Sequence, residues 1–253
     1  IKICFPPMPG QVNCMHSKLM LLFYDDYMRI VIPSANLTKY DWGEDGRMEN
    51  SVFIIDLPGP LAASGEKSQS VDDLPPFGQE LHYFLRRMEV PESLETAILR
   101  YDFSPTAHLA FIHTVGGSHF GEDMERTGYP GLSRAVRQLD LETTLPMQID
   151  FAASSLGSLN EAFLKTMYDA VSGIGPSLNA AANGKIAKGQ QLRDSFRIYF
   201  PTHETVANSF GGTDAAGTIC LRRQWFTAPT FPKALMRDYR SSRPGLLSHN
   251  KIL

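Results

Sequence analysis

The sequence predicts an α/β fold, in which strands and helices alternate along most of the chain. Three observations support this class. Apolar runs of strand length recur, helical stretches lie between them, and clusters of Pro, Gly, Asn and Asp mark the turns. Hydrophobic residues make up 43% of the 253 residues and charged residues 20%, which is typical of a globular protein and excludes a disordered one. Alternating elements of this kind build layered α/β domains.

Three apolar runs in the first hundred residues have the length of buried strands, and turn residues bound each of them. They cover residues 19–24, 28–32 and 52–57. Residues 61–79 are small and polar, which favours a long surface loop or an insertion. Two helices are expected next, over residues 79–88 and from Pro91, because proline suits the first turn of a helix.

The pattern restarts after residues 102–105, which form the best domain boundary and predict domains over residues 1–104 and 105–253. A Gly-, Asn- and Ala-rich stretch over residues 172–192 predicts a loop in the second domain. Further strands are predicted over residues 109–115, 147–153 and 196–200, and further helices over residues 132–139, 158–171 and 229–239.

Cysteine usage and hydropathy exclude several classes of protein. The three cysteines (Cys4, Cys14 and Cys220) form no Cys-x-x-Cys pair, which argues against a disulfide framework and against a zinc site. No apolar run approaches the roughly 20 residues that a membrane helix requires. We therefore expect no disulfide scaffold, no zinc site and no membrane partner.

The net charge of −3 conceals an asymmetry between the two ends of the chain. Residues 1–184 carry 13 Lys and Arg against 23 Asp and Glu, a net of −10. Residues 185–253 carry 11 against 4, a net of +7. A basic final segment could meet a polyanion such as a nucleic acid, or it could be an ordinary solvated face balanced by acidic neighbours.

Two tripeptides of the same His-x-Lys pattern contain the strongest candidates for catalytic residues. They are His16-Ser17-Lys18 and His249-Asn250-Lys251. With 7 His and 9 Lys in the chain, about 0.25 His-x-Lys frames are expected by chance. On a strand the first and third side chains share a face, so each frame would present an imidazole beside an ammonium. That pair suits phosphate chemistry, because imidazole can attack phosphorus or move a proton while ammonium neutralises oxyanions.

Asn36 is a candidate member of the same site. It lies twenty residues after His16 in Ser34-Ala35-Asn36, at the end of the second predicted strand, where its side-chain amide could donate to the same phosphate. The alternative is that Asn36 caps the turn that follows it.

Residues 16–22 (His-Ser-Lys-Leu-Met-Leu-Leu), residues 33–38 (Pro-Ser-Ala-Asn-Leu-Thr) and Asp41-Trp42-Gly43 together resemble the tyrosyl-DNA phosphodiesterases of the phospholipase D superfamily. Phe23 stands where most of the superfamily has an Asp after the Lys, and the DNA-repair branch also lacks that Asp. Later matches follow in order. They are the Ser-Ser-x-Gly-Ser-Leu segment at residues 154–159, Gly211-Gly212, and residues 242–245 before His249.

The resemblance implies two phospholipase D-like α-β-α sandwich domains related by pseudo-twofold symmetry. Both would be incomplete here, the first at its start before Ile1 and the second at its end after Leu253. It also implies a metal-independent DNA-repair hydrolase of the nucleus that acts on the 3′-phosphotyrosyl bond, or on other 3′ adducts, at a single-stranded or duplex DNA end. A peptide derived from topoisomerase I would be the leaving group.

The resemblance also implies roles for individual residues. His16 would attack phosphorus and form a phosphohistidine, His249 would be the general acid and then the general base, and Lys18, Lys251 and Asn36 would stabilise the charged oxygens. Glu49 and Asn50 would orient one histidine, or else form a surface turn. The residues expected to bind DNA phosphates, aided by the helix that follows them, are Ser154, Ser155 and Ser158.

Two other functions remain open at this point. The chain could be another phosphodiesterase of the same superfamily, although the missing Asp after Lys18 argues against this. It could also be a catalytically incomplete module that binds DNA or protein, because nothing after Lys251 supplies a second Asn.

Overall fold

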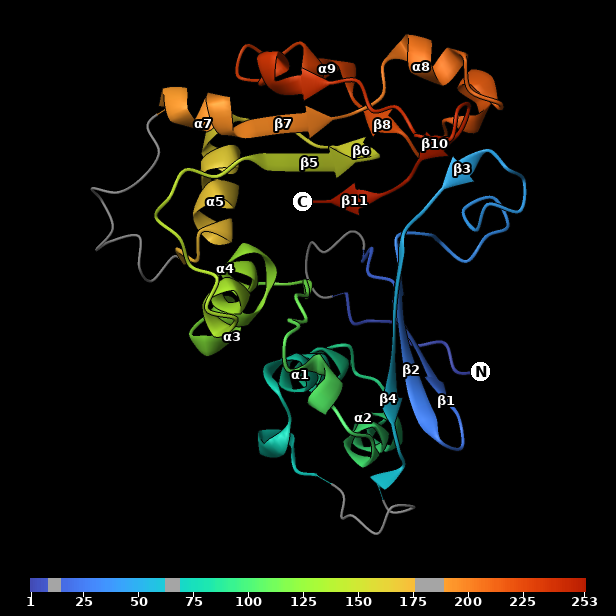
Figure 1. Ribbon diagram of the computed structural model, residues 1–253, viewed down its shortest axis with the longest axis vertical. Helices are drawn as coiled ribbons and strands as arrows, with labels where there is room; N and C mark the ends of the chain where they lie inside the picture. The colour runs from blue at the N-terminus through green and yellow to red at the C-terminus, as the bar shows by residue number, and fades with distance from the viewer. Residues whose placement is uncertain (9–14, 62–68, 176–188) are drawn as a thin grey trace. The chain divides into compact units, whose positions relative to one another are not determined.

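The computed structural model describes residues 1–8, 15–61, 69–175 and 189–253, and its ribbon is drawn in Figure 1. The chain forms two compact units. Unit 1 comprises Ile1–Val31, Ile54–Thr143 and Asp169–Gly184, and unit 2 comprises Ile32–Phe53, Thr144–Tyr168 and Lys185–Leu253. The domain boundary expected between residues 104 and 105 stays a prediction. Cys14 and most of the loop expected over residues 172–192 lie outside the described residues.

The sheet of unit 1 contains the three strands predicted in the first hundred residues. These are β1 (Met20–Phe23), β2 (Tyr27–Pro33) and β4 (Val52–Pro58), in the order β1-β2-β4. The pairing of β1 with β2 is antiparallel, with Met20 opposite Val31, as a tight turn between them requires. Arg29 of β2 donates from Nε to Asp56 Oδ1 of β4 at 2.7 Å.

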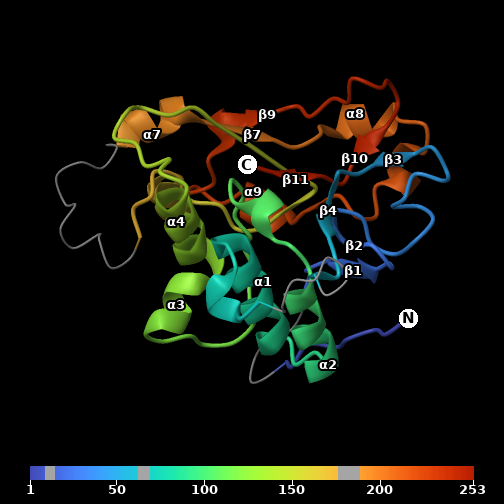
Figure 2. The same ribbon diagram turned by 60° about the horizontal axis from the view of Figure 1, so that its bottom comes forward.

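Helices complete unit 1. They are η2 (Val71–Asp73), α1 (Pro76–Arg87), α2 (Glu92–Glu95), η3 (Thr96–Arg100), η4 (Ser104–Thr106), α3 (Glu122–Arg126) and α4 (Gly128–Gln138). Figure 2 shows α3 and α4 next to each other. The loop expected over residues 61–79 is wrong for its last part, because Ser70 and Asp73 form a capping box and Pro76 starts α1.

The strand predicted over residues 109–115 does not form. Within the described residues this segment makes a single isolated bridge, from His113 to Thr127. Its apolar pattern has another cause, because Phe111 packs its ring 5.5 Å from Phe77 and 5.7 Å from Phe84, both on α1. The segment is therefore an extended strap over a helix and not part of a sheet.

The main sheet of unit 2 has the order β11-β5-β7-β9. Its strands are β5 (Ile149–Ala153), β7 (Phe196–Tyr199), β9 (Met236–Arg237) and β11 (Lys251–Ile252). The strands β5, β7 and β9 are parallel. The strand β11 is antiparallel to β5, as Figure 1 shows. The alternate burial of β7, with Phe196 and Ile198 at 2% and 0% exposure, places one face of the sheet in the core.

Two short parallel pairs extend unit 2 beyond this sheet. In the first, β3 (Met48–Glu49) pairs with β10 (Leu247–Ser248), and in the second, β6 (Ser155–Leu156) pairs with β8 (Cys220–Leu221). Met48 and Leu247 form a small core with Val206 and Ala215. The helices of unit 2 are α7 (Gly189–Ser195), α8 (His203–Ala207), η5 (Gly212–Ala215), α9 (Arg223–Phe226) and η6 (Lys233–Leu235), and α5 (Glu161–Val171) begins in it.

The helix predicted over residues 229–239 is wrong. Pro232 has no N–H group and biases the residue before it away from helical angles, so only the short turn η6 forms after it. Met236 then pairs with Ile198 as the start of β9. In the part of the chain that the structure describes, no helix combines the length and the apolar character that crossing a bilayer requires.

Candidate active site

The parallel pair of β3 and β10 places His249 beside Asn50. Leu247 lies opposite Met48 and Ser248 opposite Glu49, and the His249 N–H donates to the Glu49 carbonyl at 2.9 Å. The next residue on β3's side is Asn50, whose Oδ1 lies 3.2 Å from His249 Nδ1. Only 3% of His249 is exposed. Backbone pairing therefore places the His249 imidazole against the Asn50 amide, where the imidazole is almost fully shielded from solvent.

The hydrogen bonds of Asn50 determine which way its amide faces. Its Nδ2 donates to the Asp41 backbone carbonyl at 2.6 Å, and a carbonyl can only accept, so Oδ1 must face His249. Ser34 Oγ also donates to that Oδ1, at 2.8 Å. An acceptor at Nδ1 requires the proton of a neutral imidazole to be on Nδ1. His249 Nε2 is then the nitrogen that can take up a proton or, when the ring is protonated, deliver one.

Asn36 is fixed by a buried carboxylate. Both its backbone N–H and its Nδ2 donate to Asp41 Oδ2, at 2.8 Å and 2.5 Å. Asp41 is 2% exposed. Burial first, and then the Asp41 carboxylate, raise the pKa of the neighbouring Tyr40, whose hydroxyl donates to the Ala215 carbonyl. The Asp41 carboxylate therefore fixes Asn36 within the loop between β2 and β3.

Asn250, the middle residue of the second His-x-Lys frame, ties that frame to the same loop. Its Oδ1 accepts from Ser51 Oγ at 2.7 Å and from Ser34 Oγ at 3.3 Å. Its Nδ2 donates to Ser248 Oγ at 2.8 Å. Because Asn250 is 9% exposed, these contacts hold the backbone on both sides of the frame without competition from water.

The two lysines of the frames make the same local contact. Lys251 Nζ donates to the His249 carbonyl at 2.6 Å in unit 2, and Lys18 Nζ donates to the His16 carbonyl at 2.9 Å in unit 1. In each frame the ammonium therefore lies close to the backbone of its own histidine. His16 and Lys18 belong to unit 1 and the other candidate residues to unit 2, so the grouping of both frames into one site stays a prediction.

The predicted DNA-binding serines lie next to the second frame. Lys251 is opposite Ala153 in the β11–β5 pair, so Ser154 and Ser155 directly follow the paired residue. Ser154 is buried, and its Oγ has no hydrogen-bond partner among the described residues, whereas Ser155 is exposed and donates to the Thr218 carbonyl at 3.1 Å.

The helix expected to begin at Ser158 begins three residues later. Its first residue is Glu161, because Asn160 Oδ1 accepts the Phe163 N–H at 2.9 Å and so caps the helix. Ser158 itself is exposed and stands outside the first turn.

Arg222 and Arg223 are functional candidates that the sequence reasoning missed. In the β6–β8 pair Leu156 lies opposite Leu221, so Gly157 and Arg222 leave the ends of two adjacent parallel strands together. The Arg222 guanidinium stacks 4.9 Å from the centre of the Trp225 ring. Both arginines are exposed. An Arg-Arg pair just after a two-residue strand has no periodic signal, and only the strand register reveals its position beside the serine segment.

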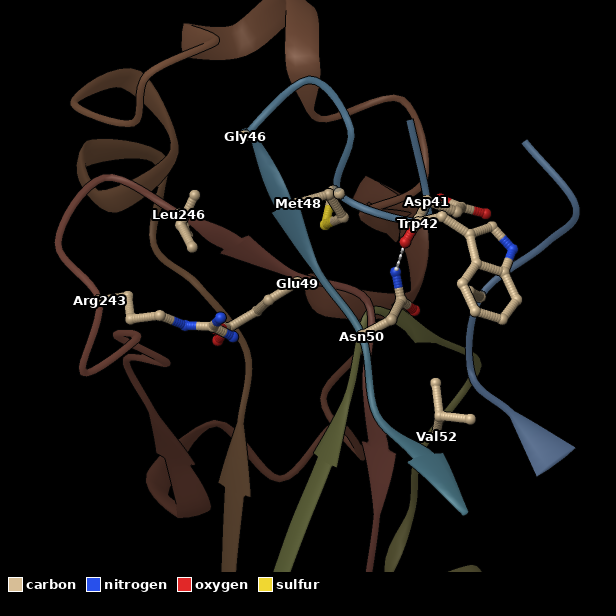
Figure 3. Close-up of a pocket in the computed structure, with 11 residues that line it drawn as sticks. Asp41, Trp42, Gly46, Met48, Glu49, Asn50, Val52, Arg243 and Leu246 are labelled. Carbon is tan, nitrogen blue, oxygen red and sulfur yellow. Dashed lines mark hydrogen bonds and ion pairs between the residues drawn. The ribbon is translucent and has the colours of Figure 1, made fainter. Parts of the chain in front are cut away.

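The side chain of Glu49 points toward Arg243, whereas that of Asn50 points toward Asp41 (Figure 3). Its carboxylate accepts from Arg243 Nε at 2.9 Å and also from Arg243 Nη2. The two side chains line a cavity of about 260 Å³ together with Asp41, Trp42, Met48 and Asn50, and Figure 3 shows the residues around it. The Glu49 carboxylate is thus engaged by an arginine, while Asn50 lies against the histidine.

Unit 1 contains a separate buried histidine, His113. Its Nε2 lies 3.2 Å from Glu80 Oε2, and Arg126 and Arg134 also contact Glu80. Burial alone would raise the pKa of Glu80, but hydrogen bonds from His113 and Arg126 and the two guanidinium charges lower it. This cluster joins α1, α3 and α4 to the strap and explains why charged groups are buried there.

Across residues 1–8, 15–61, 69–175 and 189–253, no group of three or more His, Cys, Asp or Glu side chains is arranged to hold a metal ion. The family model of the tyrosyl-DNA phosphodiesterases matches residues 1–253. No curated protein matches the sequence.

Solved structures of yeast tyrosyl-DNA phosphodiesterase share the fold. One has a TM-score of 0.59 at 16% identity and covers 89% of this chain and 52% of its own. A variant of the same yeast protein has a TM-score of 0.58 at 20% identity and covers 85% and 47%. The chain therefore spans about half the length of these proteins and shares their α/β fold. With the family model matched along its whole length, the chain belongs to the tyrosyl-DNA phosphodiesterase family.

Proposed function

We propose that the protein hydrolyses the 3′-phosphodiester that links DNA to a tyrosine, through a covalent phosphohistidine. The observation that carries this proposal is the contact between His249 Nδ1 and Asn50 Oδ1 at 3.2 Å. It leaves Nε2 of a buried imidazole as the group that exchanges protons, and the Lys251 ammonium is held at the backbone carbonyl of the same histidine. A positioned imidazole and a fixed positive charge on one tripeptide suit acid–base chemistry on a phosphodiester.

In the first step His16 attacks phosphorus as the tyrosine leaves. A P–N bond forms to the imidazole, the P–O bond to the tyrosine breaks, and protonated His249 gives its Nε2 proton to the tyrosine oxygen. The leaving group is a peptide derived from topoisomerase I, and the DNA remains attached to His16 through its 3′-phosphate. Neutral His249 is then ready to act as a base.

In the second step water replaces His16. His249 takes a proton from the water as its oxygen attacks phosphorus, the P–N bond breaks, and DNA with a free 3′-phosphate is released. Lys18, Lys251 and Asn36 stabilise the charge on the phosphoryl oxygens in both steps. Because these donors are nitrogen groups, the proposal requires no metal ion and no cofactor.

The DNA would approach along the end of the main sheet of unit 2. Ser155, Ser158 and Arg222 follow one another from the second frame outward, as the registers of β11–β5 and β6–β8 indicate. Hydroxyl and guanidinium groups of this kind bind phosphates without reading the base sequence. The basic character of residues 185–253 supports the same approach of a single-stranded or duplex end. We expect a DNA-repair enzyme of this kind to act in the nucleus.

A His249→Arg substitution in the full-length protein tests the two-step scheme. The guanidinium cannot serve as a base, so the covalent intermediate should form and then persist, and a DNA–protein adduct should accumulate on a denaturing gel. His203→Arg is the matched control, since His203 is an exposed histidine at the start of α8 in the same unit. If neither variant accumulates an adduct while His249→Arg has lost turnover, the covalent scheme is wrong.

Two further measurements address the nucleophile and the metal. His16→Ala should abolish both adduct formation and cleavage of a 3′-phosphotyrosyl oligonucleotide, because no P–N bond can form. Cleavage by the unchanged protein should be the same in excess chelator as without it. Activity that disappears with the chelator and returns with a divalent ion would replace this proposal with a metal-dependent nuclease.

A further inference from the structure

Asp41 contacts both asparagines of the candidate site but has no role in the proposed reaction. Its Oδ2 accepts two hydrogen bonds from Asn36, one from the backbone N–H and one from Nδ2. Its backbone carbonyl accepts the Nδ2 of Asn50. The residue is 2% exposed, and its second oxygen, Oδ1, has no hydrogen-bond partner within the described part of the chain. Figure 3 shows Asp41 above Asn50, joined to it by that bond.

The chemistry of these contacts fixes the Asn36 amide in one orientation. A carboxylate accepts hydrogen bonds and cannot donate, so the Asn36 group that faces Asp41 must be Nδ2. Turning the amide over would set its carbonyl oxygen against the carboxylate, which is strongly unfavourable in a buried place. One of the two Nδ2 hydrogens is then held by Asp41, and the other remains directed away from it as a donor.

The backbone carbonyl of Asp41 determines the orientation of the Asn50 amide. Because the Asp41 carbonyl takes the Nδ2 of Asn50, the Oδ1 of Asn50 is left to face His249 Nδ1. Asp41 therefore influences Asn36 through its side chain and Asn50 through its main chain. A substitution at position 41 removes the first effect directly, while the second depends only on the backbone remaining in place.

We propose that Asp41 is a positioning residue, which aims one N–H of Asn36 at the phosphoryl oxygens of the substrate. The proposal deepens the proposed function and rests on it. Asp41 does not touch the reacting atoms. Without it the Asn36 amide turns freely between two orientations, and a donor misplaced by about 1 Å can lose on the order of a hundredfold in rate.

The property of Asp41 that matters is its acceptor oxygen and not its charge. Both donors from Asn36 reach the same oxygen, Oδ2, so an asparagine at position 41 can offer its Oδ1 to both of them. Its Nδ2 would then occupy the place of the unpartnered Oδ1. Asp41→Asn should therefore recover most of what Asp41→Ala loses.

A double-mutant cycle between Asp41 and Asn36 in the full-length protein tests this assignment. Asp41→Ala alone should slow formation of the covalent adduct about 10- to 100-fold in single turnover. In an Asn36→Ala background the same change should cost less than about threefold, because the group that Asp41 aims is gone. If Asp41→Ala does not fold, Asp41→Ser replaces it, since its hydroxyl is too short to reach the amide. Asp45→Ala, an exposed carboxylate of the same loop, is the control.

A second readout separates this proposal from the proposed function. Binding of an oligonucleotide with a 3′-phosphate, followed by fluorescence anisotropy, reports the contact with the phosphoryl oxygens without any turnover. Coupling between Asp41 and Asn36 in both readouts supports the assignment. Coupling in binding alone, in a protein that cleaves no phosphotyrosyl bond, keeps the positioning role and rejects the reaction. Additive losses, an Asp41→Ala protein within twofold of the unchanged one, or no binding by the unchanged protein would overturn the assignment.

Discussion

Replacing Asn50 with leucine removes the acceptor of the His249 imidazole while nearly preserving side-chain volume. His249 is 3% exposed, so its Nδ1–H would lose its partner where no water can replace it, at a cost of about 1–3 kcal/mol. The Asp41 carbonyl loses a donor at 2.6 Å, which adds about 1 kcal/mol. Ser34 adds little, since its hydroxyl can turn to Asn250 Oδ1 at 3.3 Å. The free energy of unfolding should therefore fall by about 2–4 kcal/mol.

The expected effect of Asn50→Leu on the reaction is larger for the second step than for the first. Without an acceptor at Nδ1, the proton of neutral His249 can move to Nε2, and that tautomer cannot take a proton from water. A positioned base contributes about 10²–10⁴ in rate, and we expect the loss of orientation to remove about 10- to 100-fold of this. The covalent adduct should accumulate as is expected for His249→Arg, though transiently.

The assay for Asn50→Leu combines urea unfolding with a time course of adduct formation and decay on denaturing gels. Asn208→Leu is the control, because Asn208 is an exposed asparagine at the end of α8 in the same unit. An Asn50→Leu protein that is less stable, yet decays its adduct within twofold of the unchanged rate, would refute the reasoning. Asn50 would then support the fold and not the histidine.

Three other substitutions should change either the free energy of unfolding or the rate at which the covalent adduct decays. Asp238 accepts from Thr205, the Thr202 N–H and Arg240, and these bonds outweigh the opposing effect of burial and lower its pKa to about 2. Its folded pKa is then below the unfolded value of about 3.9, so its contribution is complete above pH 4 and is lost as pH falls towards 2. Asp238→Ala should lower the free energy of unfolding by about 1–2 kcal/mol at pH 7, and the difference from the unchanged protein should shrink as pH falls through about 2. Gly245 has a φ of +83° and its added Cβ would lie 2.7 Å from the ring of Phe210, so Gly245→Ala should cost about 1–3 kcal/mol in urea unfolding. Asn250→Ala leaves the Ser51 hydroxyl without the acceptor that it has at 2.7 Å, and it should slow adduct decay about tenfold while Gly217→Ala, at an open position in the same unit, has no effect on that rate.

Much of the fold could be predicted because its strands carry local signals. The runs at residues 19–24, 28–32 and 52–57 and the strands β5 and β7 are apolar and bounded by turn residues, so their sequence and their structure agree. The strap at residues 109–115 has the same apolar pattern but packs against α1. An apolar run alone cannot distinguish a strand paired in a sheet from an extended segment packed on a helix. Two-residue strands such as β3 and β10 carry no pattern at all.

The candidate site, like the fold, could be predicted from the sequence only in part. The two His-x-Lys frames and the serine segment are recognisable as short motifs, and Asn50 was a candidate because it lies just before a predicted strand. The part played by Asp41 could not be predicted, because a buried aspartate five residues after Asn36 reads as turn chemistry until the hydrogen bonds are known. Arg222 was missed because its position depends on the register of β6 with β8, which sequence spacing does not reveal.

The pairing of β3 with β10 also has a consequence for how the protein is made. Asn50 and His249 stand 199 residues apart in the chain. At the usual rate of about 5–20 residues per second, roughly 10–40 s separate their synthesis. During that interval the segment that carries Asn36 and Asn50 has left the ribosome without the strand that pairs with it. Contacts this distant in sequence also form slowly once both partners exist. The histidine site is therefore among the last parts of unit 2 to assemble, and a chain whose synthesis stops within that interval cannot contain it.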